Sequence, residues 1–134
     1  MAGKNVGNFI QKVALFGGAG WLAENAVCDQ DQYRYSSLFR GLKIPFMPIY
    51  AVNGVALTGV APYIANWPWL ARGLVYSALG TGIEWVSCQI DRKLIGGSSW
   101  NYGGSEALAI ATGGCVSFTR SALWAGVGLV AEQV

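Results

Sequence analysis

The sequence contains no histidine and little charge of either sign. Charged residues make up 12% of the 134 residues, about half of the share found in soluble domains. Without histidine, no Ser–His or Cys–His pair can form, and without a Cys-x-x-Cys motif a zinc or haem site is disfavoured. The net charge of +2, with no lysine- or arginine-rich run, argues against nucleic-acid binding. We therefore expect no catalytic residue, no cofactor, no metal and no nucleic-acid partner, and we predict that the protein is not an enzyme.

Cysteine is also scarce. Cys28, Cys88 and Cys115 form an odd set, and all three lie in apolar surroundings. A disulfide framework of a secreted protein normally uses an even number of cysteines. The sequence therefore favours small, buried hydrophobic side chains at these positions over disulfide bonds.

Apolar residues and glycine are abundant instead. Hydrophobic residues make up 53% of the chain, which holds 19 glycines, and the mean hydropathy is +0.37. The stretch between Lys43 and Arg72 is uncharged, and it is longer than the about 20 residues that a helix needs to cross a bilayer. Polar residues soon after Lys4 interrupt any signal-peptide core, so we expect the first helix to be retained. The sequence predicts an all-α, multi-pass integral membrane protein, one domain over 1–134, with about four transmembrane helices over 6–28, 46–64, 69–90 and 106–131.

Charges outside the expected spans predict an orientation in the membrane. The two loops that follow the first and third spans hold five basic residues, which are Arg34, Arg40, Lys43, Arg92 and Lys93. The opposite side holds Lys4 and Arg72. Because basic residues concentrate in cytoplasmic loops, this count places the two loops in the cytoplasm and both termini outside.

One motif occurs twice, sixty residues apart. Gly-x-x-x-Glu-x-x-x-Cys-x-x-Asp stands at residues 20–31 and again at 80–91, and Gly54 and Gly114 recur at the same offset in the helix expected after each copy. The repeat indicates two tandem helical hairpins, related by an axis along the membrane normal. The alternative is chance similarity in a chain rich in glycine and alanine.

The repeat also predicts how the helices pack. Residues four apart share one helix face, and glycine lets a neighbouring helix approach closely. The expected packing residues are Gly20, Gly80, Gly54 and Gly114. Glu24 and Glu84 lie one turn beyond the first two of these glycines, so they would face neighbouring helices rather than lipid.

Charged residues in and beside the spans form a candidate polar or ligand site. They are Glu24, Glu84, Arg40 and Arg120. A charge at the bilayer centre costs about 2.5–3.5 kcal/mol on insertion scales and usually faces the bundle interior. The site would serve as a proton or ion path, a polar ligand site or a lipid headgroup pocket, or it would be a buried cluster that only fixes helix packing.

Six short motifs occur in an order that resembles a known family. They are Gly20-Trp21-Leu22-Ala23-Glu24, Phe39-Arg40-Gly41-Leu42, Pro48-Ile49-Tyr50, Gly82-Ile83-Glu84-Trp85-Val86-Ser87, Trp100-Asn101-Tyr102 and Ser121-Ala122-Leu123-Trp124. From about residue 16 to residue 126, the chain resembles the type IV ABC-transporter permease family of CmpB-like membrane proteins, which includes the transmembrane protein 229 group. Phe39, Ala51 and Asn101 depart from that family's Asn, Gly and Asp. The resemblance implies a small multi-helix membrane protein.

Two functions remain open at this point. The first is a non-enzymatic transport- or lipid-associated component that contacts membrane lipids and either other membrane subunits or further copies of itself. The second is a structural membrane protein of a larger assembly, such as a virion membrane or an organelle complex. Neutralising Glu24 and Glu84 would separate the two, because a structural role predicts misassembly and a transport role predicts loss of transport alone.

Overall fold

The structure is a computed structural model, and it is built from α-helices. It describes residues 2–27, 48–96, 100–103 and 105–133, and these contain no strand. The helices are α1 (Ala2–Val27), α2 (Pro48–Ile64), α3 (Trp69–Ile95), α4 (Ala107–Ala111) and α5 (Phe118–Ala131). The predicted all-α class is therefore confirmed.

The helix boundaries agree with the sequence for the first three helices and differ for the fourth. α1, α2 and α3 lie where helices were expected, with ends shifted by a few residues. The helix expected over 106–131 is instead divided into α4 and α5. Gly113 and Gly114 lie between them with φ angles of 63° and 85°, a left-handed conformation that favours glycine and ends a helix.

The agreement in helix position does not extend to the prediction that these helices span a membrane. No helix in the described part of the chain is both long and apolar enough to cross a bilayer.

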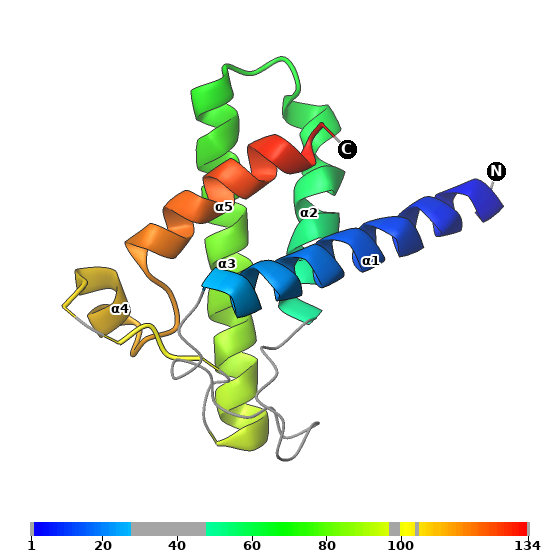
Figure 1. Ribbon diagram of the computed structural model, residues 1–134. Helices are drawn as coiled ribbons and strands as arrows, with labels where there is room; N and C mark the ends of the chain where they lie inside the picture. The colour runs from blue at the N-terminus through cyan, green and yellow to red at the C-terminus, as the bar shows by residue number, and fades with distance from the viewer. Residues whose placement is uncertain (1, 28–47, 97–99, 104, 134) are drawn as a thin grey trace.

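The four longer helices pack as two hairpins (Figure 1). α1 packs mainly against α2, and α3 packs mainly against α5, while α2 also contacts α3 and α5 and so joins the hairpins. In Figure 1, α1 and α5 cross α2 and α3 obliquely, and the first half of α1 extends away from the other helices. The interior of the molecule therefore lies where α2, α3 and α5 meet.

Each helix of the first hairpin places an aromatic ring over a glycine of the other helix. A Cβ atom at Gly20 would lie 2.5 Å from Cγ of Tyr50, and a Cβ atom at Gly54 would lie 2.6 Å from Cδ2 of Phe16. Real Cβ atoms essentially never come this close to another atom. Only glycine therefore fits at these two positions as the helices are packed.

The second hairpin repeats this reciprocal ring-on-glycine contact. A Cβ atom at Gly80 would lie 2.7 Å from Cβ of Trp124, and one at Gly128 would lie 2.5 Å from Cδ2 of Tyr76. The two hairpins thus use one packing scheme, an aromatic residue and a glycine on each helix, with the two glycines facing the two rings.

The register of the repeat changes between the first and second helix of each hairpin. Gly20 and Gly80 are sixty residues apart, as the sequence motif indicated, whereas Gly54 corresponds to Gly128, seventy-four residues away. The predicted pairing of Gly54 with Gly114 is wrong, because the ring-on-glycine contact that matches that of Gly54 is made by Gly128. Gly114 lies in the turn that follows α4.

An ion pair fixes the turn between α2 and α3. Nη1 of Arg72 donates to the carbonyl oxygens of Ala65 (3.1 Å) and Trp67 (3.0 Å), and its Nη2 lies 3.1 Å from Oε1 of Glu132. The other carboxylate oxygen of Glu132 accepts from the Tyr76 hydroxyl at 2.6 Å. Arg72 therefore ties the turn to the end of α5.

Two side chains cap the start of α5. The Ser117 hydroxyl accepts from the backbone N–H of Arg120 at 3.2 Å. The Glu106 carboxylate accepts from the backbone N–H groups of Phe118 (2.8 Å) and Thr119 (3.1 Å). Because the first N–H groups of a helix lack partners within the helix, these bonds position α5, and with it Trp124.

We expect loss of either cap to lower stability measurably. Ser117→Ala should cost about 1 kcal/mol, the usual loss for a serine N-cap. Glu106→Gln should cost about 0.3–1 kcal/mol, because it removes negative charge at the positive end of the helix dipole. Thermal unfolding of the purified protein measures both, with the exposed Ser105→Ala as a control that should leave the midpoint unchanged. Equal midpoints for Ser117→Ala and Ser105→Ala would contradict the capping role.

Candidate polar site

Glu84 is the centre of a buried polar cluster. It lies on α3, one turn after Gly80, and only 2% of the residue is exposed. The Nε1–H of Trp124 donates to its Oε2 at 3.1 Å, and the Tyr102 hydroxyl donates to its Oε1. Both oxygens of the carboxylate are thus held by neutral donors from two other parts of the chain.

Tyr102 lies between Glu84 and Arg120. The guanidinium carbon of Arg120 lies 5.0 Å from the centroid of the Tyr102 ring, within the range of a cation–π interaction. The hydroxyl of the same ring donates to the Glu84 carboxylate. The structure therefore brings two of the four predicted site residues, Glu84 and Arg120, into one cluster through a tyrosine.

Tyr102 belongs to a segment that covers Glu84, residues 100–103 and 105–117, which we call the strap. Two hydrogen bonds hold its two ends side by side. Nε1 of Trp100 donates to the carbonyl oxygen of Cys115 at 2.9 Å, and the backbone N–H of Tyr102 donates to the carbonyl oxygen of Gly114 at 2.9 Å. Trp100, Cys115 and Val116 are buried together with Cys88 in one cluster. The two ends of the strap are therefore packed into the interior, whereas other positions of the strap, such as Ser105, are exposed.

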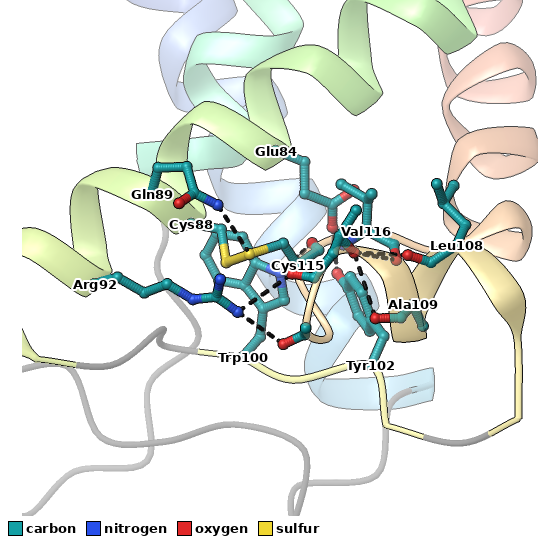
Figure 2. Close-up of a disulfide and its surroundings, with 12 residues drawn as sticks. Glu84, Cys88, Gln89, Arg92, Trp100, Tyr102, Leu108, Ala109, Cys115 and Val116 are labelled. Atoms are coloured by element: carbon teal, nitrogen blue, oxygen red, sulfur yellow. Dashed lines mark hydrogen bonds between the residues drawn. A yellow bond between two sulfur atoms is a disulfide. The ribbon is translucent and has the colours of Figure 1, made fainter.

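A disulfide joins the strap to α3. The sulfur atoms of Cys88 and Cys115 are 2.00 Å apart, and both residues are fully buried (Figure 2). The sequence predicted buried cysteines but not this bond, so that part of the prediction is wrong. The spacing of 27 residues gave no sign of the pairing, which depends on how the strap folds back. Cys28 lies outside the described residues.

Three residues on one face of α3 hold the strap. Glu84, Cys88 and Arg92 are four residues apart, so they stack along the helix. Glu84 accepts the hydrogen bond from Tyr102, Cys88 forms the disulfide, and Nη2 of Arg92 donates to the carbonyl oxygens of Thr112 (3.3 Å) and Gly113 (2.7 Å). Figure 2 shows these side chains reaching from α3 toward the strap.

The other predicted site residues fall where the structure gives no side-chain geometry. Glu24 lies in α1, but its side chain is outside the described part of the chain. Arg40 lies in the segment 28–47, which is also outside it. Their membership of the site stays a prediction.

The sequence did not predict Tyr102 and Trp124, which both donate to Glu84. The signal was available, because both residues belong to motifs that carry the family resemblance. A buried carboxylate needs donors, and a tyrosine or tryptophan combines an apolar body with one polar group that seeks a partner when buried.

A comparison with protein families gives the chain a place among known proteins. A family model described as "Putative ABC-transporter type IV" matches residues 13–134. The chain belongs to this family. No curated protein and no solved structure matches the sequence at a significant level. The ABC-transporter type IV match confirms the resemblance seen in the six motifs and supports a membrane- and transport-associated role.

Proposed function

We propose that this protein is a non-enzymatic, membrane-embedded component of a transport assembly. Membership in an ABC-transporter family supports the transport association. The observation that carries the membrane part is the large number of bulky apolar side chains that face outward on the long helices.

Large apolar side chains point outward along the long helices. Among those about half or more exposed are Phe9, Ile10, Leu22, Leu74, Ile90, Leu94, Leu123 and Val130. The buried residues include polar and charged ones, namely Asn53, Thr58, Glu84, Asp91 and Ser117. A helix of a soluble protein normally turns its apolar stripe inward and its charges outward. Outward-facing apolar side chains, together with charged side chains that are buried in a largely apolar interior, suit a protein whose surroundings are acyl chains.

The charged residues of α3 are compatible with a position of this helix inside the membrane. Glu84 and Asp91 are buried, and Arg72 is half-buried and paired with Glu132. Arg92 and the exposed Lys93 lie in the last turn of α3. None of these charges therefore has to meet acyl chains midway along the helix. Aromatic side chains are exposed beside the turn between α2 and α3, where Trp67 and Trp69 would suit the headgroup layer.

Membrane extraction tests the proposal. The expressed protein should remain in the membrane pellet after alkaline carbonate treatment and should be released only by detergent. Leu74→Glu should lower the integrated fraction severely, because a charge facing acyl chains costs about 2.5–3.5 kcal/mol at the bilayer centre. Ser105→Glu, at an exposed position of the strap, is the matched control and should integrate normally. Release of the wild-type protein by carbonate, with Leu74→Glu behaving like the control, would refute membrane embedding.

Within such an assembly, we propose that the Glu84 cluster is the polar site that a ligand or transported group meets. A structural role is the second candidate, and one observation favours it: both carboxylate oxygens already accept hydrogen bonds from the protein. Glu84→Gln separates the two, since it keeps the size of the side chain and removes its charge. Intact assembly with loss of transport or lipid binding supports the ligand site, whereas failure to assemble supports the structural role.

A further inference from the structure

The disulfide marks one end of the bundle. α3 starts at Trp69, directly after its turn with α2, and reaches Cys88 nineteen residues later, which is about 28 Å along the helix axis. The strap, with Cys115, packs at this far end. The proposed embedding places α3 across the membrane, although its composition alone does not reach the apolarity of a spanning helix. In that arrangement the disulfide and the α2–α3 turn lie toward opposite sides of the membrane.

Disulfides are specific to a compartment. They form and persist in oxidising compartments, whereas the cytosol keeps thiols reduced. The exposed fraction of both Cys88 and Cys115 is 0%, so an oxidant can reach their thiols only before the strap has packed onto α3. The bond must therefore form while the chain folds, on the side of the membrane where the strap emerges.

We propose that Cys88 and Cys115 are the substrate of a dithiol–disulfide oxidase, and that the strap end of the bundle faces the oxidising, extracytoplasmic side. In this reaction the two thiols lose two protons and two electrons and form the S–S bond. The disulfide of the oxidase takes up the two electrons and two protons and becomes a dithiol. The inference rests on the proposed membrane embedding.

This orientation is opposite to the one that the basic residues predict. That prediction counts Arg92 as a loop charge, yet its guanidinium donates to the carbonyl oxygens of Thr112 and Gly113 in the strap. A difference of a few basic residues is a weaker indicator than a covalent bond that one compartment forms and the other reduces. The two indicators make opposite predictions, so an experiment decides between them.

Thiol trapping tests the oxidation in a Cys28→Ser background, which leaves only the two cysteines of the bond. Cells are quenched with acid and N-ethylmaleimide, and the protein is then reduced and treated with a polyethylene glycol maleimide. Two thiols should be protected in ordinary cells and none in a strain without its extracytoplasmic thiol oxidase. The further change Cys88→Ser should leave no protected thiol in either strain. Free thiols in ordinary cells, or a bond that persists without the oxidase, would overturn the proposal.

Two reporter cysteines test the orientation in the same background. Ser105→Cys places an exposed thiol on the strap, and Ala65→Cys places one at the α2–α3 turn. A membrane-impermeant maleimide should label Ser105→Cys in intact spheroplasts and Ala65→Cys only after lysis. The reverse pattern overturns the orientation while leaving the membrane embedding intact. A protein that carbonate releases from the membrane would instead overturn the proposed function, so the two failures are distinguishable.

Discussion

Alanine at Gly80 is expected to destabilise the protein strongly, whereas alanine at Gly82 on the same helix should be neutral or slightly stabilising. A Cβ atom at Gly80 would lie 2.7 Å from Cβ of Trp124, and a Cβ atom at Gly82 would meet nothing within 4 Å. Overpacking of this kind typically costs about 1–3 kcal/mol. Removing an unneeded glycine from a helix instead gains up to about 1 kcal/mol. Thermal unfolding of the purified variants measures the difference.

The second helix of the same hairpin offers an independent pair for this test. Gly128 faces the ring of Tyr76, whereas a Cβ atom at Gly126 would lie in open space. Gly128→Ala should therefore lower the unfolding midpoint and Gly126→Ala should not. If all four variants behaved alike, the ring-on-glycine contact would not be what fixes the distance between α3 and α5.

Truncating Glu84 to alanine is the second change with a large expected effect. It would leave the Nε1–H of Trp124 and the hydroxyl of Tyr102 without their acceptor in the interior. Each unsatisfied buried group costs about 1–3 kcal/mol, so for the two groups we expect a total loss of about 2–6 kcal/mol. Glu84→Gln keeps one acceptor oxygen and should cost clearly less. Unfolding in detergent compares the two variants.

A double-mutant cycle isolates the hydrogen bonds from other effects of truncation. Tyr102→Phe removes the hydroxyl that donates to Glu84, so adding this change to Glu84→Ala should cost little more than Glu84→Ala alone. Groups that share a hydrogen bond behave in this non-additive way. Fully additive losses would show that Glu84 acts elsewhere and that the bond to Tyr102 contributes nothing.

Local sequence spacing predicted the packing on the first helix of each hairpin. Gly20 and Gly80 carry the same motif, and each faces an aromatic ring of the next helix. The same offset of sixty residues does not hold for the contact glycines of the second helices. The matching glycine is Gly128 rather than Gly114, because the two contact glycines are 48 residues apart in the second hairpin and 34 apart in the first, and no local pattern marks that difference. The membrane spans stay a prediction.

In the candidate site, too, contacts between residues close in sequence could be predicted, and contacts between distant residues could not. A glutamate one turn after a packing glycine was enough to predict that Glu84 faces the interior. Its donors, Tyr102 and Trp124, are eighteen and forty residues away in the sequence. The disulfide between Cys88 and Cys115 likewise depends on the return of the strap. Helical periodicity cannot predict such partners, because it describes only residues within a few turns of each other.

The position of Cys115 in the sequence also determines when the disulfide can form during translation. It leaves the ribosome 27 residues after Cys88. At about 5–20 residues per second, the delay between the two is about one to five seconds. During that interval Cys88 has been synthesised but Cys115 has not, so the Cys88 thiol waits for its partner. The first hairpin is complete by then, and the bond closes only as the chain approaches its last helix.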